Sequence, residues 1–162
     1  MQRYVVDENV LVLANMQNLD ADPTCIIRCI EILQELVEGG NVAIDAHELI
    51  FDAYRKHCNF SGQPNAGDEF FKFIYLNQYT ENRCLRIQLT QNEQREFDEF
   101  PDSDELREFD RDDRKFAAVA LCCHPIARVI NATDSDWWDF REAFLTFGLV
   151  VDFTCPERFE GR

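Results

Sequence analysis

Three aspartates in this 162-residue chain stand where a short apolar segment ends. They are Asp7 after residues 4–6, Asp45 at the end of residues 41–45, and Asp134 just after residues 127–132. Segments of this length and composition predict buried strands. Because ligands of parallel sheets bind outside the carboxyl ends of the strands, we expect these carboxylates to meet at one edge of a sheet.

Carboxylates that crowd together repel one another unless a cation lies between them. Mg²⁺ and Mn²⁺ prefer oxygen ligands, and their bound waters can attack a phosphate. A single aspartate at a strand end more often caps the following helix, but several on one edge favour a metal site. The pattern therefore predicts a divalent-cation site suited to phosphodiester hydrolysis.

The charge balance is acidic, with 31 Asp and Glu against 16 Lys and Arg and a net charge of −15. A protein that binds nucleic acid by neutralising phosphates is expected to be basic. The balance instead indicates bound hard cations, a basic protein partner or simple solubility. Bound divalent ions would locally reverse the sign of the charge. Much of the excess lies in residues 93–113, which we interpret as a solvated, partly mobile connector.

The seven cysteines are an odd number without a C-x-x-C pair, which argues against a secreted disulfide framework. We expect most of them to be small buried side chains with free thiols, and a zinc site is the weaker alternative. The N-terminal apolar stretch is interrupted by residues 7–9, and no apolar run is long enough to span a bilayer. These features predict a cytoplasmic protein with no membrane association.

Apolar periodicity alternates between strand-like and helix-like segments along the chain. Strands are expected at 4–6, 41–45, 84–89, 127–132 and 148–153, and helices at 24–38, 46–57, 67–78, 113–124 and 136–147. This alternation predicts one α/β domain over residues 1–162, with a mainly parallel central sheet of about five strands. The aromatic run at 70–75 is expected to pack in the core, with a homodimer or partner groove as the alternative.

Three short motifs resemble conserved blocks of the PIN-domain nucleases. They are Val-Val-Asp7-Glu-Asn9-Val, similar to V-x-D-T-N-V; Asp113-x-x-Phe-Ala-Ala, similar to D-x-x-I-A-A; and Thr133-Asp134-Ser135-Asp136-Trp137, similar to T-x-D-x-D-F/W. The motifs occur in the family's order. The resemblance implies a three-layer α/β/α sandwich that hydrolyses RNA, or less often DNA, with Mg²⁺ or Mn²⁺.

The resemblance also implies roles for individual residues. Asp7 would be a metal ligand from the first strand, and Asp113 would point into the site from a helix N-terminus, where the dipole favours negative charge. Asp134 and Asp136 would complete the metal site or orient the attacking water. Asn9 would support the site by hydrogen bonding, and Thr133 belongs to the same supporting group.

Two basic residues near Asp113 are candidates for binding the substrate. Arg111 and Lys115 flank this aspartate and would hold substrate phosphates beside the metal. The alternative is that they are solvated charges paired with the surplus of acids.

The sequence departs from the PIN pattern on the helix after the second strand, where the family usually has a glutamate. Ala53 occupies the expected position, and Asp52 or Glu48 would have to compensate. The leading hypothesis is therefore an endoribonuclease of toxin or defence type, held in check by a partner protein. The alternative is a weakened PIN-like module that binds a basic protein. A phosphatase with a nucleophilic aspartate ranks last, because Asn9 stands where D-x-D requires an acid.

Overall fold

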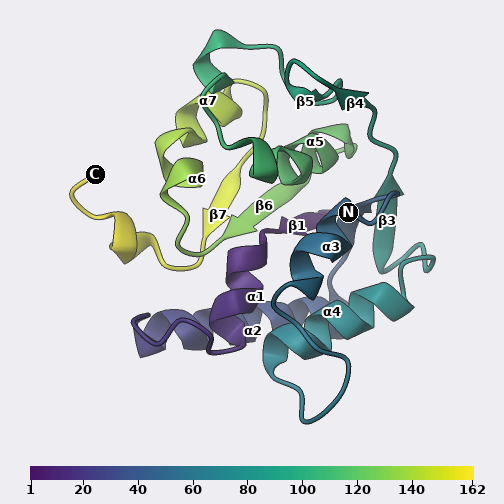
Figure 1. The fold of residues 1–162 in the computed structure, drawn as a ribbon, viewed down its shortest axis with the longest axis vertical. Helices are drawn as coiled ribbons and strands as arrows, with labels where there is room; N and C mark the ends of the chain where they lie inside the picture. The colour runs from purple at the N-terminus through teal and green to yellow at the C-terminus, as the bar shows by residue number, and fades with distance from the viewer.

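The five predicted strands form one all-parallel sheet in the computed structural model, which describes residues 1–162 (Figure 1). They are β1 (Tyr4–Val6), β2 (Val42–Asp45), β3 (Cys84–Ile87), β6 (Arg128–Asn131) and β7 (Val151–Phe153), in the order β3-β2-β1-β6-β7. The central strands are almost continuously apolar because helices cover both faces of the sheet.

Helices form a layer on each side of the sheet, which makes the fold a three-layer α/β/α sandwich (Figure 1). One layer contains α1 (Glu8–Ala14), α2 (Pro23–Gly39) and α4 (Ala66–Leu76). The other contains α5 (Arg114–Cys122), with α6 (Ser135–Asp139) and α7 (Arg141–Leu145) beside it. Helix α3 (Leu49–Arg55) contacts α1, α4 and α5. The aromatic run of α4 packs in the core as expected, since Phe70, Phe71 and Ile74 are buried. None of the helices combines the length and apolar character needed to cross a bilayer.

The sheet order reverses beside β1, and this reversal determines where a ligand is expected. The chain leaves β1 for β2 on one side and later crosses to β6 on the other. In open parallel sheets, such a switch point opens a crevice beyond the carboxyl ends of the two strands. Asp7 directly follows β1, and Asp134 lies three residues after β6. The topology therefore brings these two aspartates to the same crevice.

The short helix α1 was not predicted from the sequence. Asp7 is its N-cap, and the Asp7 carboxylate accepts a hydrogen bond from the backbone N–H of Asn9 at 3.1 Å. The helix has seven residues, too few for a clear helical period, and Val10, Leu11 and Leu13 are all buried. Such a run does not differ in pattern from a buried strand.

Helix α3 begins at Leu49, three residues later than expected, because of Asp45. The Asp45 carboxylate accepts hydrogen bonds from the backbone N–H groups of His47, Leu49 and Ile50 at 2.8–2.9 Å. These bonds hold a turn between β2 and α3. The expectation that Asp45 joins the other carboxylates is therefore wrong, since its oxygens are used locally. The helix expected at 136–147 is also divided, into α6 and α7, at Phe140.

The acidic stretch 93–113 is structured, which corrects its interpretation as a solvated, mobile connector. It contains β5 (Glu96–Phe97), which pairs with β4 (Gln91–Asn92), and the 3₁₀ turns η1 (Asp104–Leu106) and η2 (Arg111–Asp113). Four apolar side chains anchor it to the core: Phe97, Phe100, Leu106 and Phe109. Their burial, spread between the acids, orders the segment although its composition is charged.

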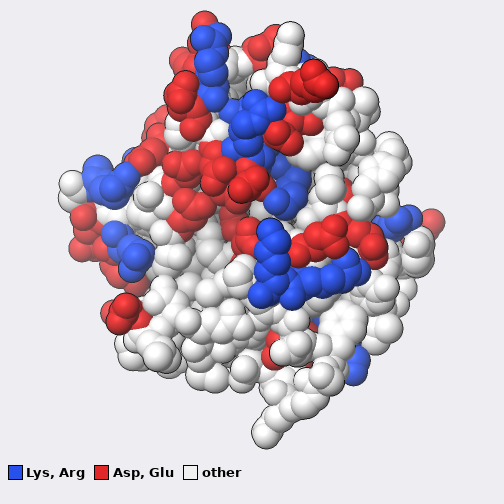
Figure 2. All heavy atoms as spheres, in the orientation of Figure 1, with Lys and Arg blue, Asp and Glu red and all other residues white.

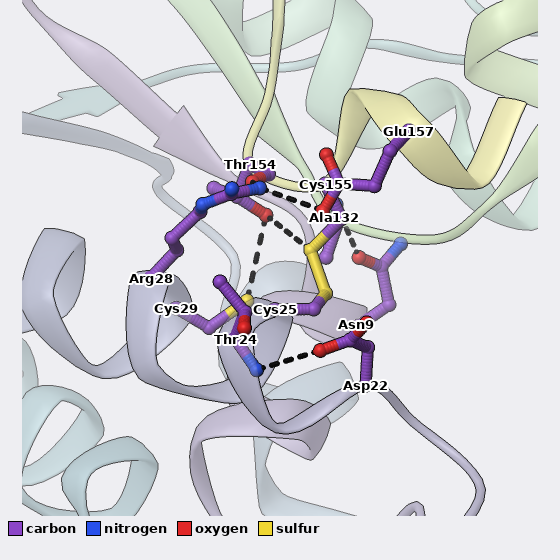
Figure 3. The surroundings of a disulfide bond; sticks show 10 residues. All are labelled: Asn9, Asp22, Thr24, Cys25, Arg28, Cys29, Ala132, Thr154, Cys155 and Glu157. Atoms are coloured by element: carbon purple, nitrogen blue, oxygen red, sulfur yellow. Dashed lines mark hydrogen bonds and ion pairs between the residues drawn. A yellow bond between two sulfur atoms is a disulfide. The ribbon is translucent and has the colours of Figure 1, made fainter. Parts of the chain in front are cut away.

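Cys25 and Cys155 form a disulfide, which corrects the expectation that these thiols are free (Figure 3). The bond joins α2 to the segment that precedes η3 (Pro156–Phe159), across 130 residues of sequence. Cys29 lies one helical turn from Cys25, and its sulfur is 3.4 Å from the hydroxyl of Thr154. The five remaining cysteines are free and mostly buried, as expected: Cys29, Cys58, Cys84, Cys122 and Cys123.

Candidate metal centre

Asp7 lies at the centre of the site, at the junction of β1 and α1. Its residue surface is 1% exposed, and its second carboxylate oxygen accepts a hydrogen bond from the indole N–H of Trp137. Trp137 is itself fully buried, so the ring acts both as packing and as a fixed donor. Burial raises the pKa of Asp7 to about 7, while the bonds from Asn9 and Trp137 partly oppose this rise.

Asp113 faces Asp7 from the junction of η2 and α5. The side chain is buried, and its carboxyl group lies in hydrogen-bonding contact with that of Asp134. Burial, followed by the negative charges of Asp7 and Asp134, raises the pKa of Asp113 to about 10. The Asp113 carboxyl therefore retains its proton at neutral pH when no cation is bound.

Glu8 is the third carboxylate of the cluster, and the sequence analysis did not predict it. Carboxylate oxygens of Asp7, Glu8 and Asp113 all lie within 4.8 Å of one another. Glu8 occupies the first turn of α1, and its Oε2 is 3.3 Å from the imidazole Nε2 of His57. In the sequence, the only sign of Glu8 was its position directly after Asp7. Glu8 joins the cluster because helix α1, which the sequence did not predict, begins at this residue.

Asp134 and Asp136 lie in the turn at the start of α6. Asp134 is the N-cap and accepts the backbone N–H of Asp136 at 2.9 Å. Asp136 accepts the backbone N–H of Asp110 at 3.1 Å, which ties the turn before η2 to α6. Asp134 therefore borders the cluster through Asp113, whereas Asp136 lies outside the three-carboxylate group and holds the surrounding loop.

Asn9 connects the ends of β1 and β6, as expected of a supporting residue. Its amide nitrogen donates to the side-chain oxygen of Asn131 at 2.6 Å, and its oxygen accepts the backbone N–H of Ala132 at 2.8 Å. Asn131 is fully buried and was not predicted, because its strand position gives no polar pattern. Thr133 lines a cavity of about 250 Å³ next to the disulfide and makes no side-chain hydrogen bond. These contacts fix the two strand ends that carry Asp7 and Asp134.

Neither residue proposed to compensate for Ala53 joins the cluster. The carboxylates of Asp52 and Glu48 form ion pairs with Arg55, at 2.5 Å and 3.2 Å, on the exposed side of α3. Ala53 is 4% exposed and belongs to the hydrophobic core. In this structure Glu8, rather than an acid on α3, supplies a third carboxylate.

Arg111 and Lys115 are bound to protein groups near Asp113. The Arg111 guanidinium donates to the carboxylate of Glu96 and to the backbone oxygens of Gln94 and Glu93. The ammonium group of Lys115 donates to the backbone oxygen of Asp112. Arg111 thus pairs with an acid, as the alternative expects, whereas Lys115 bonds only a backbone oxygen.

The donor set fits a hard divalent cation. Its atoms are all carboxylate oxygens, which Mg²⁺ and Mn²⁺ prefer over nitrogen or sulfur. Asp7 and Asp113 are buried, and no Lys or Arg side chain bonds to either of them. Buried like charges without a positive partner are costly. A bound cation would remove this cost and lower both raised pKa values.

We expect the metal-free protein to lose stability as the pH rises from about 4 toward 10. Aspartates in the unfolded chain have a pKa of about 3.9. In the folded chain the pKa of Asp7 is raised to about 7 and that of Asp113 to about 10, so both keep their protons to higher pH. The folded chain then binds more protons than the unfolded chain, so the free energy of unfolding falls with rising pH. Urea unfolding in EDTA between pH 5 and 8.5 measures this slope.

The Asp113→Asn variant is the control for this slope, because other acids also titrate. Its free energy of unfolding should fall less steeply with pH than that of the unaltered chain. Equal slopes for both proteins would contradict the raised pKa of Asp113.

Searches for related proteins found no similarity: no protein-family model, no curated protein and no solved structure matches this chain.

Proposed function

We propose that this chain is a PIN-like nuclease that hydrolyses phosphodiester bonds, most readily in RNA, with Mg²⁺ or Mn²⁺. The carrying observation is that carboxylate oxygens of Asp7, Glu8 and Asp113 meet within 4.8 Å at the switch point of a parallel sheet. A cytoplasmic enzyme of toxin or defence type, restrained by a protein partner, is part of the same proposal.

The arrangement of the three PIN-like motifs supports the proposal. The first motif lies more than a hundred residues before the other two in sequence, yet the three aspartates lie together: Asp113 faces Asp7 and is in hydrogen-bonding contact with Asp134. Unrelated short matches would have no reason to converge on one crevice. The α/β/α fold that the resemblance implies is also the fold of this chain.

The residues of the site divide the expected chemistry among them. Asp7, Glu8 and Asp113 would hold the cation, and a bound divalent ion would polarise the phosphoryl group and make a coordinated water more acidic. Asp134 is half-buried beside Asp113, in a position to accept a proton from the attacking water. Trp137 keeps the Asp7 carboxylate in one orientation through its indole N–H.

A PIN-like interaction module is the second candidate, and two observations favour it. The core position of Ala53 leaves no acid on α3 in the cluster, and the net charge of −15 favours a basic protein partner. On this alternative the acidic crevice binds basic side chains and cleaves nothing.

An RNA cleavage assay with a single-variant comparison separates the two candidates. We expect the unaltered chain to cleave single-stranded RNA with Mn²⁺ and to be inactive in EDTA. Glu8→Gln should lower the rate by at least about 10-fold, since loss of even an outer-shell partner of a metal costs about 10- to 100-fold. Asp52→Asn removes an equal charge from an exposed residue paired with Arg55 and should leave the rate unchanged. Absence of cleavage by the unaltered chain at any Mn²⁺ concentration would favour the interaction module.

A further inference from the structure

Four arginines line one cavity on the far side of the segment that carries Asp113. The cavity has a volume of about 270 Å³ and lies between the β4–β5 hairpin, η1 and η2; its guanidinium groups belong to Arg95, Arg107, Arg111 and Arg114. Figure 2 shows Lys and Arg atoms gathered directly beside the largest group of Asp and Glu atoms on this face. The chain has only 16 Lys and Arg against 31 acids, and four of these basic residues line this single cavity.

Arg114 is the most constrained of the four. The residue is 3% exposed, and its Nε and Nη2 donate to the backbone oxygens of Leu106, Arg107 and Phe109. Its guanidinium lies 4.7 Å from the centre of the Phe100 ring. The remaining nitrogen, Nη1, has no acceptor in the protein, yet it is not sealed from solvent. The fold therefore fixes a buried cation in the cavity wall and leaves its Nη1 nitrogen without a protein acceptor.

Arg95 is held in the same way, by backbone oxygens instead of a carboxylate. Its Nε donates to the oxygen of Phe100 at 2.8 Å, and its Nη2 donates to that of Asp98 at 3.2 Å. Arg107 and Arg111, in contrast, form ion pairs with Asp104 and Glu96. Asp102 is the one acid in the lining itself. Two of the four positive charges thus have no carboxylate bonded to them.

Arg95 and Arg114 both line this cavity without a carboxylate bonded to either guanidinium. An anion bound in the cavity would compensate these two charges. Planar guanidinium groups that present several N–H donors recognise phosphate oxygens in particular.

We propose that this arginine cavity binds a backbone phosphate of the RNA strand. Arg111 and Arg114 flank Asp113 on η2 and α5, so the cavity and the carboxylate cluster lie on two sides of one short segment. One bound RNA strand would then contact both the cluster and the cavity. The identity of the ligand as RNA rests on the proposed function, whereas the anion site rests on the arginines.

Binding in EDTA tests the cavity without cleavage. The probe is a fluorescein-labelled ten-nucleotide RNA, and the readout is fluorescence anisotropy across a range of salt concentrations. Arg95→Gln and Arg107→Gln should each weaken binding about 5- to 10-fold and reduce the slope of log affinity against log salt by about 0.7, the value for one lost contact with a single strand. Arg28→Gln is the matched control, since Arg28 loses the same charge but pairs with Glu157 near the disulfide. Arg114 is left intact because its side chain supports the backbone of η1.

A second measurement reports on Arg114 directly. Titration with inorganic phosphate should shift the ¹H–¹⁵N signal of the Arg114 Nε, and RNA should shift the same signal. Equal RNA affinities for the unaltered chain, Arg95→Gln and Arg107→Gln would overturn the proposal, as would a signal that moves with phosphate but not with RNA. RNA cleavage by the unaltered chain, with binding that the arginine variants leave unchanged, would contradict the cavity proposal but support the nuclease. Binding that depends on the cavity arginines, without any cleavage, would support the cavity but contradict the nuclease.

Discussion

Replacing Asp113 with asparagine is expected to stabilise the metal-free protein while reducing Mn²⁺-dependent RNA cleavage at least about 100-fold. The buried carboxyl of Asp113 lies against Asp7 and Asp134, and its pKa is raised to about 10. One pKa unit corresponds to about 1.4 kcal/mol, so relieving only part of this perturbation should add about 2–3 kcal/mol to the free energy of unfolding at pH 8. An amide at position 113 can still donate to Asp134, so packing is preserved.

The loss of cleavage has a separate cause. Asparagine removes one negative ligand from a site built of carboxylates, and the proposed cation loses charge compensation as well as an oxygen donor. Asp112→Asn is the matched control, because the neighbouring Asp112 side chain is exposed and outside the cluster. Thermal unfolding in EDTA and a cleavage assay with Mn²⁺ measure the two effects. An Asp113→Asn protein that is less stable than the unaltered chain would contradict the carboxylate repulsion described above.

The second large effect is expected from the Cys25–Cys155 disulfide. Cys155→Ser should lower the free energy of unfolding by about 2–5 kcal/mol, because the bond closes a long loop and restricts the unfolded chain. The bond spans 130 residues, which places the expected loss toward the upper end of that range. Urea unfolding of the variant and of the unaltered chain without reductant gives the difference.

Reduction provides an independent check on the disulfide. The unaltered chain in dithiothreitol should match Cys155→Ser, and Cys122→Ser, which removes a free and half-buried thiol, should match the unaltered chain. Identical stability of all these samples would contradict a stabilising bond. Disulfides are uncommon in the cytoplasm, so under the cytoplasmic proposal the reduced chain is the form whose cleavage activity matters most.

The sheet and two of the site aspartates could be predicted from the sequence for a physical reason. Each strand of a covered parallel sheet is a short apolar run, and the carboxyl end of each run is marked by the first polar residue. Asp7 and Asp134 stand at such ends and meet because β1 and β6 are neighbours. Asp45 stands at another end, but three nearby backbone N–H groups take up its oxygens. Position at a strand end therefore does not distinguish an aspartate of the site from one that holds a local turn.

The rest of the site depends on contacts between distant segments. Glu8 reaches the cluster because α1 starts directly after β1, and a seven-residue apolar helix has no clear period in the sequence. Asn131 is recognisable only through its bond to Asn9, 122 residues away. The pairing of Cys25 with Cys155 likewise joins residues far apart in sequence. The arginine cavity forms only when the acidic stretch folds onto α5.

Calorimetric titration with Mn²⁺ at pH 7.5, in two buffers of different ionisation enthalpy, tests the metal centre most directly. Metal ligands must be deprotonated to bind, so a site whose carboxyls retain a proton at this pH should release it on binding. We predict Mn²⁺ binding with net proton release by the unaltered chain, and loss of both in Asp7→Asn. Absence of binding, or equal binding by Asp7→Asn, would contradict a metal centre at Asp7, Glu8 and Asp113.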